Sequence, residues 1–193
     1  MLKAKSLYHL IVYSIFFIII LISFFTFIII NNAHEELQEK ITTLKEDYTN
    51  NQKALLKNYV NYVIKFIDYY YIENRDKFDE ETIQQNLILA LDHLNISSNP
   101  NEYIFIFDIN GNLIDNSNDK QEIGKNFLNY KDSKGKNVVK ELIEASKNSD
   151  GGFVNYFWSK PSLTKETNKI SYVKSYDRWS WTIGKGVYLD EID

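Results

Sequence analysis

The C-terminal stretch decides the fold, and residues 151–193 read GGFVNYFWSKPSLTKETNKISYVKSYDRWSWTIGKGVYLDEID. Aromatic and β-branched residues recur in it at the period of two that is typical of β-strands. The connections contain Pro161 and the pair Asp177 and Arg178, which interrupt the pattern. The predicted strands are 152–159, 169–176 and 180–188.

A hairpin is predicted upstream of these strands. Tyr103–Asp108 is strand-like, residues 109–111 (Ile-Asn-Gly) form a turn, and Asn112–Asp115 returns as a short strand. A polar stretch and a helix at about 137–147 follow. The two antiparallel groups are expected to form one five-stranded sheet, with a helical insertion between the second and third strands.

Helical spacing dominates the segment before the hairpin. From Glu35 to about Tyr71, no Gly or Pro interrupts the chain. Apolar residues recur there at threes, fours and sevens, the period of one helix face. These residues are Leu37, Ile41, Leu44, Tyr48, Leu55, Tyr59, Tyr62, Phe66 and Tyr70. A second helix is predicted from Asp79, as N-cap, to about Leu94, followed by a loop at 95–101.

An uncharged apolar run from Leu10 to Ile30 has the length of a membrane span. A secretory signal peptide is the rival interpretation, but its apolar region is shorter and ends in small residues. Lys3 and Lys5 precede the run and Glu35 follows it, which places the N-terminus in the cytoplasm. We therefore expect an uncleaved single-pass anchor in the inner (cytoplasmic) membrane, with the rest of the chain periplasmic or extracellular.

Composition narrows the classes of function. The 193 residues carry a formal net charge of −4 and no basic patch, so nucleic acid is not an expected partner. The chain has no Cys, which removes thiolate catalysis and cysteine metal sites. No catalytic constellation stands out, so no enzyme activity, cofactor or metal is expected. The turn after Asp108 resembles a calcium loop only superficially, because its Gly stands fourth rather than sixth.

Three motifs together resemble the single-Cache type-2 family of extracytoplasmic sensors. They are NEYIFIFDINGNLID (101–115), EIGKNF (122–127) and the C-terminal stretch with its Trp-x-Trp-x-Ile-Gly-x-Gly-x-Tyr order. The resemblance implies an α+β fold, in which the transmembrane helix continues into a long stem helix packed on a PAS-like five-stranded antiparallel sheet. The implied organisation is 1–9 cytoplasmic, 10–30 transmembrane, 31–72 stem helix and 73–193 Cache domain.

The resemblance also implies what the domain binds. Ligands of the family are small molecules, often short carboxylates. Asn116 and Ser117 stand where many relatives have His-Pro, so the family's usual ligands cannot be assumed. In the family, the segment that matches the C-terminus leads into a second membrane span and an intracellular output domain. A fragment of a larger receptor, or a truncated relative of one, is therefore expected.

Candidate site residues follow from which side chains share a strand face. Composition alone favours a solvated surface position for Lys169, whereas the family match favours an anion-binding role. Core packing is the competing interpretation for the aromatic candidates, above all for Phe105. Asn116 is included because it takes the position of the family's His. The candidate set is Tyr103, Phe105, Asn116, Tyr130, Tyr156, Trp158, Lys169 and Ser171.

The leading hypothesis is a ligand-sensing domain of a membrane receptor, of histidine kinase or chemoreceptor type. Its expected partners are a small ligand, the membrane, a second copy through the stem helix and an intracellular output domain. The alternative is a membrane-anchored structural or interaction protein, either a pilin-like subunit or an accessory solute-binding protein. A pilin-like N-terminus carries Gly before the apolar run and Glu within it, and this chain has neither.

Overall fold

A computed structural model describes residues 2–94, 101–161 and 166–190. The chain divides into two compact units, Met1–Tyr48 and Thr49–Asp193, which are described separately. The predicted loop at 95–101 lies outside the described residues except for Asn101, which is in a turn.

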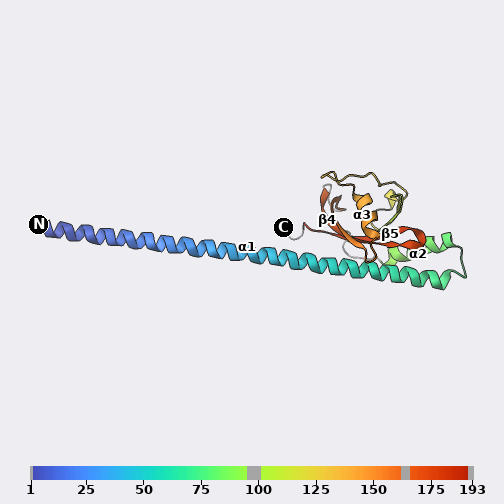
Figure 1. Ribbon diagram of the computed structural model, residues 1–193, viewed down its shortest axis with the longest axis horizontal. Coiled ribbons are helices and arrows are strands. Elements are labelled where there is room, and N and C mark those ends of the chain that lie inside the picture. The colour runs from blue at the N-terminus through green and yellow to red at the C-terminus, as the bar shows by residue number, and fades with distance from the viewer. Residues whose placement is uncertain (1, 95–100, 162–165, 191–193) are drawn as a thin grey trace. The chain divides into compact units, whose positions relative to one another are not determined.

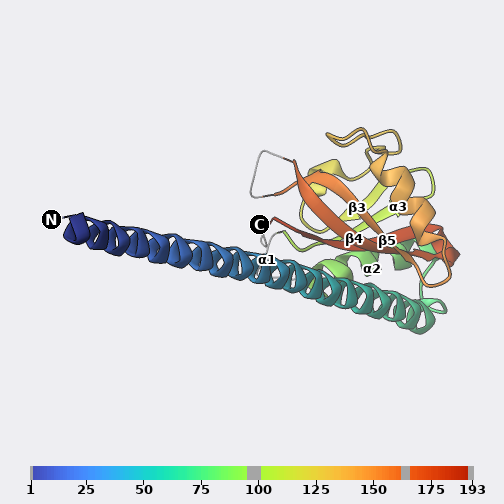
Figure 2. The same ribbon diagram turned by 60° about the vertical axis from the view of Figure 1, so that its left-hand side comes forward.

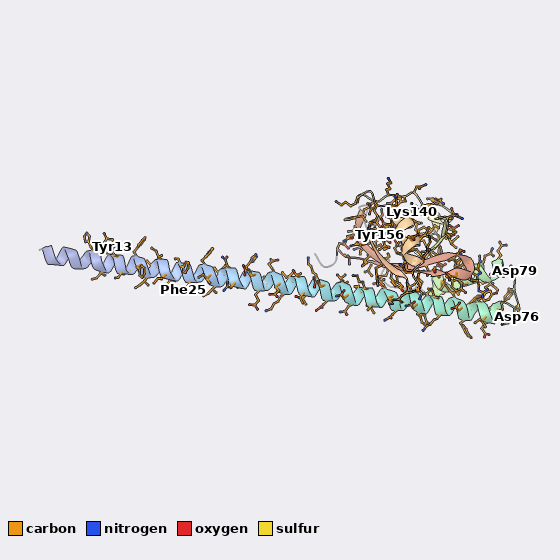
Figure 3. All side chains as sticks on the ribbon, viewed as in Figure 1. Tyr13, Phe25, Asp76, Asp79, Lys140 and Tyr156 are labelled. Carbon is orange, nitrogen blue, oxygen red and sulfur yellow. The ribbon has the colours of Figure 1, made fainter. Side chains whose placement is uncertain are left out.

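Helix α1 runs without a break from Leu2 to Asn74 and so confirms the predicted continuity of the membrane and stem segments. In the first unit its apolar side chains, Tyr13 and Phe25 among them, are exposed and project from the helix (Figure 3). It is the one helix of the described residues that is long and apolar enough to cross a membrane.

Five antiparallel strands form a single sheet in the second unit, in the order β2-β1-β5-β4-β3. Every predicted strand is present, but β4 begins three residues earlier than the predicted start at Lys169. The hairpin with β3 extends to a Ser159–Glu166 pair, so the ladder includes polar residues that carry no apolar signal. The strands are β1 Ile104–Asp108, β2 Leu113–Asn116, β3 Gly152–Ser159, β4 Glu166–Tyr176 and β5 Trp181–Tyr188.

The C-terminal part of α1 and helix α2 (Glu80–Leu94) cover one face of this sheet (Figure 1). Their buried residues, such as Val60 and Leu87, form one core with Ile104 and Ile183 of the central strands. Asp79 caps α2 as predicted, since its carboxylate accepts the backbone N–H of Thr82 at 2.9 Å. Figure 3 shows Asp79 at the turn between the two helices.

Helix α3 (Val138–Ser146) lies on the opposite face of the sheet, as the turned view in Figure 2 also shows. A second core forms there between α3 and the aromatic side chains of β1 and β3. The connection from β2 to α3, which includes the short 3-10 helix η1 (Lys120–Glu122), contributes Phe127 and Tyr130 to this core. A second 3-10 helix, η2 (Asp177–Trp179), joins β4 to β5.

Alternation sends the side chains of β4 and β5 to the two faces in turn. Ile170 and Tyr172 join the core shared with α1 and α2, whereas Val173 joins the core shared with α3. Lys169 and Ser171 share the α3 face with Val173 because they are four and two residues away from it. The long-helix-on-sheet architecture predicted from the sequence is therefore confirmed, and the candidate residues face the α3 side.

Candidate functional site

A small cavity lies between the sheet and the β2–α3 connection. The space left in it is about 20 Å³, which is room for about one water molecule. Most of its wall is aromatic or aliphatic, and the polar exceptions are Asn116, Glu122, Lys169 and the hydroxyl and indole groups of the aromatic residues. The lining residues are Tyr103, Phe105, Phe107, Leu113, Asn116, Glu122, Phe127, Leu142, Tyr156, Trp158 and Lys169.

Lys169 is the most unusual residue of the wall, because only 1% of its surface is exposed. The structure therefore excludes the solvated surface position that composition favoured. Sheet register explains the burial: Lys169 is paired with Tyr156 of β3 on one side and with Tyr188 of β5 on the other. Each of the two neighbouring strands thus places one tyrosine directly beside the lysine.

Three aromatic rings surround the Lys169 amine. Its Nζ lies 3.9 Å from the ring centre of Tyr103, 4.9 Å from that of Tyr188 and 5.8 Å from that of Phe105. Ring faces attract a cation at such distances. Among the residues that the structure describes, no hydrogen bond or ion pair to this amine is found. Burial in this surround lowers the pKa of Lys169 well below its usual value.

Hydroxyl groups line the approach to the amine. Burial raises the pKa of Tyr156, Tyr103 and Tyr188, so all three phenols stay protonated and can act as donors. Tyr188 donates to the carbonyl oxygen of Ser159 at 2.7 Å, and its oxygen lies 3.5 Å from that of Tyr103. The Tyr103 proton is therefore held only weakly and can be offered to a ligand.

Two glycines make this arrangement possible. Gly184 and Gly186 belong to β5 and lie on the α3 face, directly between the strands that carry the cavity. A Cβ atom on Gly186 would lie 2.6 Å from Cε of Lys169, and one on Gly184 would overlap the Phe105 ring. The Gly-x-Gly near the C-terminus thus allows close packing of side chains from the neighbouring strands, and its position fixes where the lysine stem crosses β5.

Six of the eight candidate residues line the cavity, and Tyr130 and Ser171 do not. Tyr130 packs behind Trp158, with ring centres 4.8 Å apart, and donates to Glu166 at 2.7 Å. Burial and this carboxylate raise the pKa of Tyr130 to about 12. Ser171 lies 2.8 Å from the Tyr156 hydroxyl and orients it. Both residues support the wall from behind.

The sequence reasoning missed Tyr188 and Glu122. Tyr188 is contributed by the last strand, and its place in the Gly-x-Gly-x-Tyr order was the available signal. Glu122 belongs to η1, where periodicity gives no information on side-chain direction. From the sequence alone, Glu122 could not be distinguished from the many acidic residues expected on the surface.

The metal-like turn is accounted for by its hydrogen bonds. The carboxylate of Asp108 accepts the backbone N–H of Asn110 and of Asn112 at 2.9 and 2.8 Å. Within the described ranges, no group of three His, Cys, Asp or Glu residues is placed to hold a metal ion. A hairpin turn with Gly111 at positive φ therefore explains this motif, as predicted.

Comparisons with known proteins agree with this geometry. The profile of the family Single Cache domain 2 matches residues 48–193. The sensor histidine kinase MctS of Rhizobium johnstonii is 31% identical over 155 residues, which cover 80% of this chain and 32% of MctS. The methyl-accepting chemotaxis protein McpP of Pseudomonas putida is 27% identical over 119 residues, 62% of this chain and 21% of McpP. This chain thus spans about a third and about a fifth of the lengths of these two relatives.

Solved structures show the same fold. A methyl-accepting chemotaxis protein from Vibrio parahaemolyticus superposes with a TM-score of 0.69 at 27% identity, covering 80% of this chain and 99% of that one. A Cache chemosensory domain that recognises carboxylic acids gives a TM-score of 0.65 at 27% identity, covering 74% of this chain and 97% of that one.

Proposed function

Because this chain belongs to the single Cache domain 2 family, we propose that its cavity binds a small carboxylate beside Lys169 and that this binding is the input of a membrane receptor. The chain carries the Cache sensor domain of histidine kinases and chemotaxis receptors. The pilin-like alternative is not favoured, since the matched relatives are receptors.

The buried amine of Lys169 carries the carboxylate proposal. Burying an ammonium without a counter-ion is costly, and ring faces offset only part of that cost. The proposal gives the amine a carboxylate partner in the cavity, which supplies the missing charge. The ligand-free cavity has room for about one water molecule, so binding requires the lining side chains to move apart. Tyr103 and Tyr156 add hydroxyl donors next to the same position. Recognition of carboxylic acids by a Cache domain of the same fold supports the proposal.

For the membrane arrangement, we propose the boundaries expected from the sequence. Residues 1–9 are cytoplasmic, 10–30 cross the membrane, 31–72 form the stem, and 73–193 form the periplasmic or extracellular sensor. The apolar, exposed first part of α1 supports the span. In this proposal the sensor acts on an intracellular output of histidine kinase or chemoreceptor type, and the sensor itself catalyses no reaction.

We also propose that α1 pairs with a second copy of the chain. Leu55, Tyr62 and Tyr69 are 60–64% exposed and stand seven residues apart. Ile41 and Tyr48 precede them at the same spacing. Apolar residues that repeat every seven positions share one helix face and match one of the two apolar positions of a coiled-coil heptad. Pairing would give the stem a partner along the face that the sheet leaves uncovered.

The carboxylate proposal is tested by titrating the full chain in detergent micelles with acetate, propionate, lactate, alanine, urea and purines. Trp158 lines the cavity and so provides a fluorescence readout. We expect at least one carboxylate to bind, and Lys169→Met to abolish binding. Lys174→Met is the matched control, because Lys174 belongs to the same strand but contacts Asn61 of α1. Binding of an uncharged compound alone, or unchanged carboxylate binding in Lys169→Met, would refute the proposal.

A further inference from the structure

We infer that Glu122 makes this cavity selective for carboxylates whose other end carries a hydrogen-bond donor, a hydroxyl or an ammonium group. The inference rests on the proposed carboxylate site and adds a second recognition point to it. The carboxylate of Glu122 lines the same cavity, and an anion-binding role does not explain a negative charge there.

Two of the cavity's lining residues carry ionisable groups of opposite sign. Lys169 lies deep in the wall with 1% of its surface exposed, whereas the Glu122 side chain is 35% exposed. The Glu122 carboxylate therefore lies toward the open side of the cavity, and the Lys169 amine lies at its buried end. The wall between them is aromatic and aliphatic except for Asn116 and the tyrosine and tryptophan polar groups.

The Glu122 carboxylate acts on the interior of the site. Its negative charge makes a minor contribution to the raised pKa of Tyr103 and of Tyr130, after burial and after the hydrogen bonds and charges of other groups. Such charge effects reach over one Debye length, roughly 8–10 Å at physiological salt. Glu122 also lines the cavity, so its charge is available to a ligand there.

The backbone that carries Glu122 is anchored on both sides. Asp119 caps η1 by accepting the backbone N–H of Gln121 at 3.0 Å. Lys120 donates to the buried Asp115 of β2 and to Asp92 of α2, both at 2.6 Å. A side chain on such a fixed turn is preorganised, so it can discriminate between ligands without a large ordering cost.

The known partner of Glu122 does not remove it from the site. Lys125 lies 3.3 Å from the Glu122 carboxylate, and the Lys125 side chain is 58% exposed. Exposed pairs of this spacing are weak and are screened by salt. A ligand donor can therefore compete for the carboxylate.

Charge balance then selects the ligand. An unsubstituted acid such as propionate would satisfy Lys169 but would turn an apolar end toward Glu122 and add a second negative charge to the site. A hydroxyl gives Glu122 a hydrogen-bond donor, and an ammonium group also balances its charge. Propionate, 3-hydroxypropionate and β-alanine have nearly the same size and differ only at the end opposite the carboxylate, so volume does not distinguish them.

The test compares these three acids on the full chain in micelles, in the wild type and in Glu122→Gln. We expect β-alanine or 3-hydroxypropionate to bind about tenfold more tightly than propionate, and Glu122→Gln to remove most of that ratio. Glu144→Gln is the matched control, because this acid is exposed on α3 and pairs with Lys147. The ratio should be unchanged in it.

The outcomes separate the two proposals. If propionate binds as tightly as the donor-bearing acids, or if the ratio survives in Glu122→Gln, the role of Glu122 is refuted while the carboxylate site stands. If no carboxylate binds to the folded wild type, the proposed function itself fails. If the affinity ratio between the donor-bearing acids and propionate disappears in Glu122→Gln but not in Glu144→Gln, both the carboxylate site and the role of Glu122 are supported.

Discussion

Lys169 on β4 and Gly186 on β5 are dependent on each other, because the lysine stem lies where a side chain at Gly186 would be. A Cβ atom on Gly186 would lie only 2.6 Å from Cε of Lys169, and it would also overlap Oγ of Ser171. The glycine is thus what lets a lysine in one strand cross the next strand and reach Tyr103. Strand register, and not loop geometry, fixes the amine among the rings.

The first prediction concerns this pair. Gly186→Ala should displace the lysine stem, weaken carboxylate binding at least about tenfold and lower the free energy of unfolding by about 1–3 kcal/mol through overpacking. Titration and denaturant unfolding measure the two effects. In a Lys169→Ala background the stability cost of Gly186→Ala should shrink but not disappear, because the overlap with Oγ of Ser171 remains. Equal costs in both backgrounds would show that the two residues are independent.

The second prediction concerns pH. The pKa of Lys169 is lower in the folded chain than its usual value near 10.5, because the site is desolvated. Between these two values the unfolded chain binds more protons, so the stability of the ligand-free chain should rise with pH. The rise ends near pH 10, where tyrosines of the unfolded chain begin to ionise. Lys169→Met should reduce this slope.

Ligand affinity should change with pH in the opposite direction. A bound carboxylate favours the charged amine, so binding takes up a proton above the depressed pKa, and affinity should fall as pH rises. Calorimetry in buffers of different ionisation enthalpy measures the proton uptake. An affinity that is independent of pH over this range would mean that the amine is not the anion partner.

The third prediction separates the ring of Tyr188 from its hydroxyl group. Tyr188→Phe keeps the ring 4.9 Å from the amine but loses the hydrogen bond to Ser159. It should reduce carboxylate affinity by a few-fold, whereas Tyr188→Leu, which removes the ring, should reduce it about tenfold or more. If the two variants bind equally well, the ring has no part in holding the amine.

The fourth prediction concerns the contacts of Lys120 with Asp115 and Asp92. Lys120→Met leaves Asp115 buried and without its cation, and should cost about 2 kcal/mol, less than a fully buried pair because Lys120 is 45% exposed. Burial already raises the pKa of Asp115, so the variant should lose stability as pH rises through that pKa. Asp115→Asn in the same chain should restore much of the loss. A failure to restore it would place the cost elsewhere.

The fifth prediction concerns pairing through α1. Leu55→Glu together with Tyr62→Glu puts two charges into the exposed stripe and should convert a dimer into a monomer, measured by sedimentation in micelles. Thr43→Glu, which is exposed elsewhere on the same helix, should leave the mass unchanged. A wild-type chain that is already monomeric at high concentration would refute the pairing.

The sequence predicted the fold well because its elements carry strong local signals. The absence of Gly and Pro from 35–71 and the cap at Asp79 were sufficient for the helices. Alternation was sufficient for the strands, except at the start of β4. There Glu166, Thr167 and Asn168 pair with β3 through their backbones, which side-chain polarity does not report.

The site was predicted in part, for a physical reason. Alternation tells which residues share a face, so Tyr103, Tyr156 and Lys169 were found together. Alternation does not tell how far a side chain reaches across a sheet. For this reason Ser171, which lies behind the cavity wall, was included among the candidates, and Tyr188 was left out. Glu122 and Tyr130 belong to an irregular connection, where only the folded chain fixes side-chain direction.

The most direct test of the account is the NMR titration of the Lys169 side chain, followed through its Cε and Nζ shifts with and without a saturating carboxylate that binds. We predict a pKa well below 10.5 in the ligand-free chain and a clear rise in that pKa when the carboxylate is bound. A Lys169 that titrates near its usual value, or whose pKa does not change on binding, would contradict the central claim.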